Sequence, residues 1–431
     1  MAAPAIDRRN GNIFILTQLL TYFSAPVLYV GVVQAAFCDK LGASAMVANL
    51  PSSTYLLGAV VPLFCAWLFP ARLEQRIVQT GYAVVAVPLL LVCAVVFFSA
   101  PNWLRIAVVI GQGLMLGVLN SIINIYLLKC LARGTTETGR ARALKYAFGF
   151  GPVAAVLGSL FAQLLLAGKI DGIGYPANFG VLYLVALPCM GVCALLVRRF
   201  RLADVPDEVV PSFLTFIRRS AGTFYEDRRL VIAWIAYLLW YCTLGGMTNL
   251  SLYTREAVGR SPLELAGLIM ALRFGFKSLA GFGLGAIAAR YGARTAMLAT
   301  VVFVGLGIAW PFVSWGYGYL AAFGFMGAGE LGGVYIINYV ISISNPAHTT
   351  RNLALLSLVA PVSSFAPAVH RGGLSRWPGA SLRAGRQTAR AATPPVARDP
   401  ARCCGGRASR APADRPESFP SPVRPRPPAR D

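Results

Sequence analysis

Three charged residues lie inside long apolar stretches of this sequence. Arg273 and Lys277 fall within residues 262–288, one helical turn apart, and Glu330 falls near the middle of 317–343. A charge at the centre of a bilayer costs at least about 2.5 kcal/mol, so it is usually paired or functional. Glu330 could carry a proton or bind a cation while Arg273 or Lys277 binds an anion. Alternatively, the three charges could form a fixed structural pairing within one half of the chain.

A stripe of aromatic residues occurs in another apolar stretch. Trp234, Tyr237, Trp240 and Tyr241 recur at helical spacing, so they can share one face of a helix. Such a face can stack on a sugar ring or an organic cation. The alternative is that these rings pack in a core or anchor at the membrane interface, and we favour this second interpretation.

Metal and cofactor chemistry has little support in the residue types. The two histidines, His348 and His370, lie outside the middle of any apolar stretch, and the nine cysteines form no C-x-x-C pair. A glycine-rich phosphate-binding loop of the Walker type is also absent from the sequence. We therefore expect no metal, no cofactor and no enzymatic activity, and we expect the cysteines to pack as small apolar residues.

The elements that must position these residues are helices of membrane-spanning length. Hydrophobic residues make up 56% of the chain and charged residues 13%, with a mean hydropathy of +0.61, which argues against a soluble protein. Apolar stretches of about 20 residues can cross a hydrocarbon core of about 30 Å. We expect an all-α polytopic membrane protein with about eleven transmembrane helices, at 13–37, 44–69, 77–99, 104–130, 143–167, 178–197, 231–253, 262–288, 295–315, 317–343 and 352–369.

The distribution of positive charge predicts the orientation in the membrane. The net charge is +22, and the arginines and lysines concentrate in alternate short loops. This positive-inside pattern predicts a cytoplasmic N-terminus, and it argues against a basic groove for nucleic acid. We expect a multi-pass protein of a bacterial plasma (inner) membrane, surrounded by lipid. The loops expected on the cytoplasmic side are 70–76, 129–145, 198–230, 289–294 and 344–351.

Four segments are expected along the chain. Residues 1–197 form an N-terminal six-helix bundle, 198–230 a cytoplasmic linker with an amphipathic helix, and 231–369 a C-terminal bundle of helices 7–11. Residues 370–431 are rich in Arg and Pro, a composition that predicts disorder. Because no twelfth helix follows the eleventh, we hypothesise that a reading-frame shift altered the C-terminus. A genuine basic tail is the alternative.

A short basic turn with the spacing Ala-Arg-x-x-x-Arg occurs in both halves, each time between two apolar stretches. The same turn at matching places indicates a duplicated unit. The two copies are Ala71-Arg72-Leu73-Glu74-Gln75-Arg76 and Ala289-Arg290-Tyr291-Gly292-Ala293-Arg294.

Together with the two sets of helices, these turns resemble the major facilitator superfamily, in which Gly-x-x-x-Asp-Arg-x-Gly-x-Arg/Lys follows helices 2 and 8. Ala71 and Ala289 stand where the family has Asp. The resemblance implies a cytoplasmic latch that holds the two halves together and that must recruit another acid or be weak. The latch residues that match the family's turn are Arg72 and Arg76 in the first copy and Gly285, Arg290, Gly292 and Arg294 in the second.

The resemblance also implies which side chains face the substrate, because helices 1, 4, 7 and 10 line the central cavity of that family. The polar and aromatic residues expected there are Gln18, Tyr22, Asn120, Asn124, Tyr237, Trp240, Tyr241, Asn249, Glu330 and Asn338, with Arg273 and Lys277 on helix 8.

The function implied is that of a secondary transporter, a monomer that moves a small polar organic solute by alternating access and couples it to H+ by symport or antiport. Residues Gly149 to Pro152 are similar to a Gly-Pro element of the family's antiporters, although small residues also serve close helix packing. Two alternatives are kept. One is a non-transporting assembly factor or receptor on the same scaffold, and the other is a transporter inactivated by its altered C-terminus.

Overall fold

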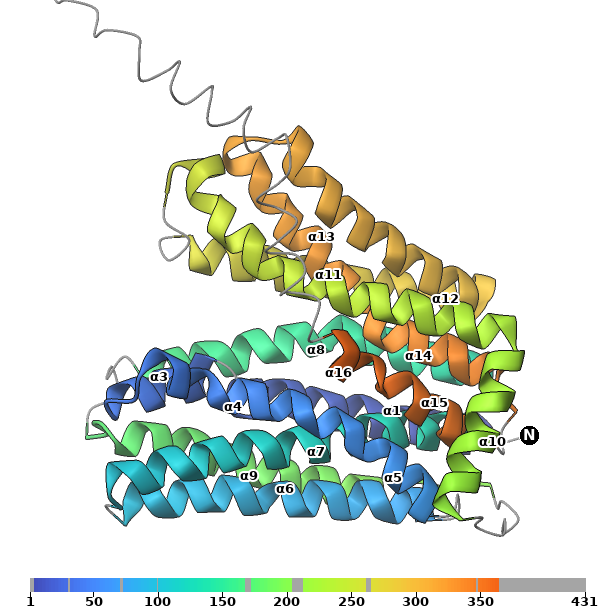
Figure 1. Ribbon diagram of the computed structural model, residues 1–431, viewed down its shortest axis with the longest axis horizontal. Helices are drawn as coiled ribbons and strands as arrows, with labels where there is room; N and C mark the ends of the chain where they lie inside the picture. Colours follow the sequence, from blue (N-terminus) through green and yellow to red (C-terminus); the bar gives the residue numbers. More distant parts are fainter. Residues whose placement is uncertain are drawn as a thin grey trace, which may run out of the picture. The chain divides into compact units, whose positions relative to one another are not determined.

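The computed structural model describes residues 4–29, 32–69, 73–98, 100–166, 172–203, 212–260, 265–345 and 348–363. Within these ranges the regular structure is helical throughout (Figure 1). The helices are α1 (Pro4–Phe23), α2 (Ala25–Leu28), α3 (Val32–Lys40), α4 (Ala45–Leu57), η1 (Gly58–Val60), α5 (Val61–Leu68), α6 (Glu74–Phe97), α7 (Asn102–Gly134), α8 (Glu137–Leu166), α9 (Ala177–Val197), α10 (Phe213–Glu226), α11 (Arg228–Val258), α12 (Ala266–Val313), η3 (Gly316–Leu320), α13 (Ala321–Gly329), α14 (Gly332–Ile343), α15 (Thr349–Ser357) and α16 (Val359–Ser363).

We call α1–α9 the N-bundle and α11–α16 the C-bundle. In the N-bundle, α6 packs against α7 and α9, and α1 packs against α8 and α9. Large side chains such as Tyr126, Tyr183 and Phe14 are fully buried in this core. Four of the long helices expected from the sequence are confirmed as uninterrupted elements, namely α6, α7, α8 and α9.

The first expected helix is not continuous, so that part of the prediction was wrong. The stretch 13–37 contains the end of α1, the short α2 and most of α3, and Tyr29 after α2 is in an extended conformation (φ −86°, ψ 93°). The second expected helix, 44–69, contains one 3-10 turn, η1, but Leu57, Val60 and Val61 beside it keep helical dihedral angles. At Gly58, a side-chain Cβ would lie 2.2 Å from the backbone of α7, so the close contact with α7 requires glycine.

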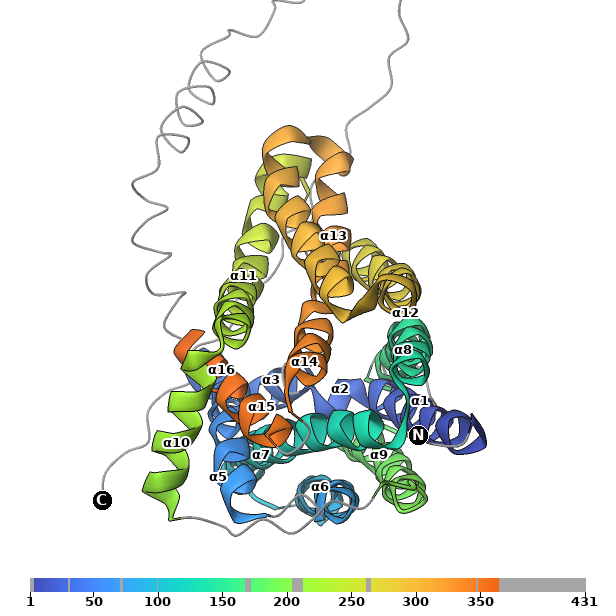
Figure 2. The ribbon, with the colours of Figure 1, turned by 90° about the vertical axis from the view of Figure 1, so that its right-hand side faces the viewer.

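The C-bundle follows the expected pattern with one irregularity. The expected helices 262–288 and 295–315 correspond to the two parts of α12, which are joined by a turn at Gly292, where φ is +84° and ψ is 169°, inside the expected loop 289–294. A positive φ of this size favours glycine. The expected helix 317–343 is confirmed as one membrane-spanning stretch, 316–343, but it is not regular throughout. It consists of η3, α13 and α14, and the break between α13 and α14 lies at Glu330 and Leu331. Helices α12 and α13 lie side by side in both views (Figures 1 and 2).

Six helices in the described residues are long and apolar enough to cross a membrane: 74–97, 102–134, 137–166, 177–197, 268–313 and 316–343. Several of the other expected spans are divided into shorter helices. The protein is an all-α polytopic membrane protein. Several features of the sequence analysis lie outside the described residues, namely Ala71 and Arg72, residues 204–211 of the linker, the start of the eighth expected helix at 262–264, the end of the last expected helix at 364–369, and the tail 370–431.

The two bundles meet along α8 and α12, where small residues allow close contact. A Cβ at Gly281 would lie 2.1 Å from the carbonyl oxygen of Phe148, and one at Gly285 would lie 2.3 Å from Cβ of Lys145. The Ser278 hydroxyl donates a hydrogen bond of 2.6 Å to the carbonyl of Gly149. This glycine-rich stretch of α8, which resembled an antiporter element, therefore packs against α12, and Gly285 of the predicted latch has a packing contact.

Candidate functional site

The three charges singled out in the sequence form one cluster, which we call the charged triad. The Glu330 carboxylate lies between two cations. Its Oε1 accepts from Arg273 Nε at 2.6 Å and lies 2.5 Å from Arg273 Nη2, while its Oε2 accepts from Lys277 Nζ at 2.7 Å. The side chains of Glu330 and Lys277 are 11% and 13% exposed, and that of Arg273 is 31% exposed. The triad carries a net charge of +1.

Two elements position the triad. Arg273 and Lys277 are one turn apart on α12, so they present their cations on the same side. Glu330 is the residue at which α13 ends, and two residues later α14 begins. A break of this kind leaves backbone carbonyls without helical partners, so the carboxylate lies where the backbone also needs hydrogen-bond donors.

Trp240 of α11 supplies one of these donors. Its indole Nε1 donates a hydrogen bond of 2.8 Å to the Gly329 carbonyl, and this bond is buried. Gly332 and Gly333 lie under the indole, because a Cβ at either position would come within 2.7 Å of the ring. Tyr237 stacks on Trp240 with ring centroids 5.4 Å apart, so these two residues of the aromatic stripe pack in the core.

The triad faces the N-bundle through Tyr22 of α1. The Lys277 ammonium lies 5.9 Å from the centroid of the Tyr22 ring, a distance at which a cation is attracted to an aromatic face. Tyr22 in turn lies 6.1 Å from the Tyr29 ring, and Gly151 leaves room for it. The site therefore combines residues from both bundles.

Tyr29 lies at the break in the first helix, and polar side chains stabilise this break. The Val27 carbonyl accepts from Gln34 Nε2 at 3.0 Å and from Gln112 Nε2 at 3.2 Å. The Leu28 carbonyl accepts from Asn120 Nδ2 at 3.4 Å, and Asn120 also contacts the Tyr55 hydroxyl at 3.4 Å. Sequence reasoning missed this break. Pro26 and Gly31 were the available signals, since both interrupt an apolar stretch.

The remaining predicted side chains are dispersed. Gln18 is buried in α1, Asn124 is exposed on α7, and the side chain of Asn249 lies outside the described residues. Asn338 is 3% exposed, and its Oδ1 has no hydrogen-bond partner among the residues that the structure describes. Tyr241 packs edge-on against Trp240 at 4.8 Å.

We call the end of the molecule that carries the N-terminus the basic end (Figure 1). A second polar cluster connects the two bundles there. Glu74, at the start of α6, is fully buried and forms ion pairs with Lys129 and with Arg133, the latter at 2.8 Å. The Lys129 ammonium also donates to the Thr350 hydroxyl, which lies 3.4 Å from the Glu74 carboxylate. Since Thr350 belongs to α15, this basic-end cluster connects the N-bundle to the C-bundle.

The predicted latch arginines are placed differently. Arg76, Arg290 and Arg294 are exposed, and within the described ranges none of them has an ion pair. Arg290 lies over the ring of its neighbour Tyr291. The acid that connects the bundles at this end is Glu74, which belongs to the first copy of the repeated turn but was not among the predicted latch residues.

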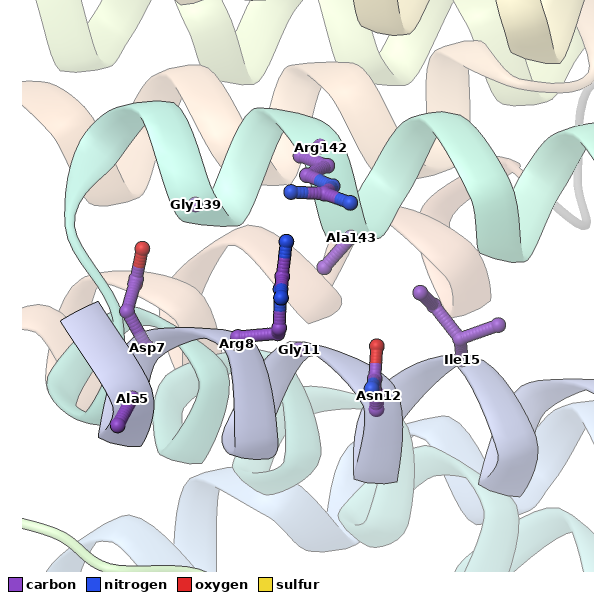
Figure 3. A pocket seen from close by; sticks show the side chains of 9 residues that line it. All are labelled: Ala5, Asp7, Arg8, Gly11, Asn12, Ile15, Gly139, Arg142 and Ala143. Carbon is purple, nitrogen blue, oxygen red and sulfur yellow. The ribbon is translucent and has the colours of Figure 1, made fainter.

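A cavity of about 470 Å³ lies elsewhere at the basic end, between α1 and α8 (Figure 3). It is lined by Ala5, Asp7, Arg8, Gly11, Asn12, Ile15, Gly139, Arg142 and Ala143. None of the triad residues contributes to it, so it is a separate feature of the molecule.

Comparison with known proteins shows the fold. No family model matches the sequence, and no curated protein matches it. The structure, however, matches many solved structures. The E. coli fucose:proton symporter FucP superposes with a TM-score of 0.68 at 13% identity, over 87% of this chain and 93% of FucP. A bacterial homologue of the iron transporter ferroportin, in its outward-facing state, gives 0.63 at 16% identity over 84% and 90%.

A human organic anion transporter gives a TM-score of 0.56 at 14% identity, over 85% of this chain and 93% of its own. FucP is described as a major facilitator superfamily transporter. At such low identity the similarity shows the fold alone, and the fold is the one that the sequence predicted.

Proposed function

We propose that this chain, which has the major facilitator fold, is a secondary transporter that moves a small organic anion together with a proton. The observation that carries the proposal is the charged triad, held at a helix break and facing Tyr22 of the other bundle. Charges within a helical bundle at membrane depth are costly and mark substrate or ion pathways. Binding sites of such transporters lie between the two repeats at interrupted helices.

The charge balance of the triad favours an anionic solute. Two cations share one carboxylate, and Arg273 is the most exposed of the three side chains. Its Nη1 has no hydrogen-bond partner among the described residues. A guanidinium edge of this kind binds carboxylate or phosphate oxygens well. The anionic group of the solute would bind Arg273 beside Lys277, and the rest of the solute would lie against Tyr22 and Tyr29.

Exchange of partners at the triad would couple the solute to a proton. An anion that binds Arg273 and Lys277 removes the positive charge that stabilises the Glu330 carboxylate. A buried carboxylate without a cation takes up a proton. The side chains that face the triad from the other bundle are Tyr22 and, behind it, Tyr29, and a tyrosine keeps its proton near neutral pH. Glu330 is therefore the group that would change charge, and anion binding would strengthen as the pH falls.

Alternating access would be a rocking of two units that correspond to residues 1–197 and 231–369. The positive-inside pattern favours a cytoplasmic location for the basic end, where the cluster of Glu74, Lys129 and Thr350 connects the bundles. We propose that the structure represents a state closed on the cytoplasmic side of a bacterial inner membrane. The protein would act as a monomer, because each chain carries both halves of the site.

A matched set of solutes tests the proposal on the full-length protein in proteoliposomes: benzoate, its amide and benzylamine, followed by aliphatic acids with their amides and amines. We expect an inwardly directed proton gradient to drive accumulation of an acid and not of its amide or amine. Glu330→Gln removes the competing carboxylate, so we expect it to bind the same acid about tenfold more tightly, with no pH dependence and no gradient-driven accumulation. Glu137→Gln, at the exposed start of α8, should behave as the wild type.

The outcomes separate the parts of the proposal. Accumulation of amides or amines in preference to acids would disprove the anion class and leave transport in place. Accumulation of an acid that does not depend on the proton gradient, with an unchanged response in Glu330→Gln, would disprove proton coupling. If no gradient drives any member of the set across the membrane, the transporter assignment itself fails.

A further inference from the structure

The lining of the cavity between α1 and α8 changes along α1. Asp7 and Arg8 lie toward the basic end, Asn12 follows one turn further along, and Ile15 lies furthest from that end, while α8 contributes Arg142 and Ala143. From Arg8 to Ile15 the helix advances seven residues, which is about 10 Å at 1.5 Å per residue. A ligand that fills this cavity must present charge at the membrane surface and an apolar portion toward the interior.

The charged end of the cavity is positive. The side chain of Arg8 points from α1 toward α8 (Figure 3), and Arg142 of α8 also lines the cavity, with its guanidinium carbon 5.9 Å from the centroid of the Tyr146 ring. Neither arginine has an ion pair among the residues that the structure describes. Two like charges facing one hollow favour an anion between them.

The acid nearest to these arginines has another role. Asp7 also lines the cavity, but both of its carboxylate oxygens accept hydrogen bonds from Thr136, from the backbone N–H at 2.8 Å and from the hydroxyl at 3.1 Å. Thr136 directly precedes α8, so Asp7 satisfies a donor at the start of that helix. These hydrogen bonds orient the Asp7 carboxylate toward Thr136. The two arginines carry two positive charges against its one negative charge, so the net charge at this end of the cavity is positive.

Two glycines at the contact between α1 and α8 leave the space that forms the cavity. A Cβ at Gly139 would lie 2.2 Å from the Asp7 carboxylate, and one at Gly11 would lie 3.6 Å from Cβ of Ala143. Gly11 and Gly139 therefore keep α1 and α8 close while leaving the space that Arg8 and Arg142 border. A volume of about 470 Å³ is within the size range of small-molecule sites.

From this geometry we infer that the cavity binds the phosphate headgroup of an anionic phospholipid, with Arg8 and Arg142 on the phosphate and the glycerol region against Ile15 and Ala143. Basic pockets between transmembrane helices at the cytoplasmic surface suit such headgroups. The amphipathic lining favours a lipid over free phosphate, because a free ion would leave the apolar end unfilled. The inference does not depend on what the protein transports.

The test compares the full-length protein in nanodiscs of phosphatidylcholine alone and of phosphatidylcholine with phosphatidylglycerol. Two readouts are the thermal midpoint and the lipid retained in native mass spectrometry. We expect phosphatidylglycerol to raise the midpoint and to remain bound preferentially. Arg8→Gln/Arg142→Gln should weaken retention on the order of tenfold, whereas Arg8→Lys/Arg142→Lys should keep most of it. Arg290→Gln/Arg294→Gln, which removes two exposed arginines elsewhere, controls for nonspecific attraction and should have little effect.

Inorganic phosphate, added to the phosphatidylcholine nanodiscs, is the second arm of the experiment. No shift is expected from it. A shift equal to that of phosphatidylglycerol would overturn the lipid assignment in favour of a free-anion site. Equal retention of the two lipids by the wild-type protein would overturn the inference without any variant, and so would an equal loss in the two double glutamine variants.

Discussion

The hydrogen bond from Trp240 to the Gly329 carbonyl holds the backbone beside the triad. We predict that Trp240→Phe keeps most of the packing but leaves this buried carbonyl without a donor, which costs about 1–3 kcal/mol. The thermal midpoint of the purified protein, measured by intrinsic fluorescence, should fall. Glu330 is the next residue after Gly329, so a shift of the Gly329 backbone would also move the Glu330 carboxylate. Binding of the transported acid should therefore weaken as well.

Trp310 provides a matched control for this prediction. Its indole Nε1 donates an equivalent bond of 2.8 Å to the Gly318 carbonyl, but at an exposed position. Where water can replace the lost donor, the cost of losing a hydrogen bond is small. An equal loss of thermal stability in Trp310→Phe and Trp240→Phe would contradict the role given to the buried bond.

The sequence showed that three charged residues lie in apolar stretches, but it could not show which of them form ion pairs with one another. Arg273 and Lys277 were assigned to one face because of their spacing, but Glu330 lies 57 and 53 residues away from them. The pairing depends on how α12 packs against α13, which is not determined by local sequence. It also agrees with both interpretations of the sequence, so the function of the triad remains a proposal that the Glu330→Gln experiment decides.

At the scale of elements, the contact between α8 and α12 depends on glycine. We predict that Gly281→Ala, whose Cβ would lie 2.1 Å from the Phe148 carbonyl oxygen, forces the two helices apart. Overpacking of this kind costs about 1–3 kcal/mol. The variant should have a lower thermal midpoint and a lower transport rate, since the two bundles meet here.

Gly283, two residues further along α12, is the internal comparison. A Cβ there meets nothing within 4 Å, and alanine is a better helix former than glycine by up to about 1 kcal/mol. Gly283→Ala should therefore leave stability unchanged or raise it. If Gly281→Ala and Gly283→Ala behave alike, the close contact at Phe148 does not limit the fold.

The long uninterrupted helices α6–α9 could be predicted from the sequence because apolar length alone defines them. The breaks within the first and tenth helices could not. Each is stabilised by donors from distant elements, such as Gln112 from α7 for Val27 and Trp240 from α11 for Gly329. A helix-breaking residue is a weak signal in a membrane segment, because neighbouring helices can satisfy the freed carbonyls.

At the scale of the whole molecule, the sequence predicted that the two halves make contact at the basic end, but it did not predict which residues form that contact. Arg76, Arg290 and Arg294 of the repeated turn are exposed, while Glu74 is buried with Lys129. Thr350 of the other bundle, 276 residues away in the sequence, approaches the Glu74 carboxylate. The sequence indicated the arginines of the turn, whereas the buried cluster consists of Glu74, Lys129 and Thr350 with Arg133 beside them. Only the packing of α15 against α5 and α7 brings them together.

The cluster of Glu74, Lys129 and Thr350 leads to a prediction about the equilibrium between forms that are closed and open at the basic end. In Glu74→Gln, Lys129 remains 2% exposed without its carboxylate as long as the basic end stays closed, and a buried unpaired charge costs about 3–5 kcal/mol. Separation of the bundles at this end would let water reach the ammonium. We therefore expect the variant to shift by at least about tenfold toward a form open at the basic end.

Native cysteines report this shift. Cys130 is buried on α7 next to Lys129, and Cys193 is buried on α9 in the N-bundle. Maleimide labelling of Cys130, followed by peptide mass spectrometry, should accelerate in Glu74→Gln, while Cys193 stays protected. Thr350→Val removes one hydrogen bond and no charge, so it should produce a smaller acceleration. Faster labelling of both cysteines would indicate unfolding instead of opening, and an unchanged rate at Cys130 would show that Glu74 does not control the closed state.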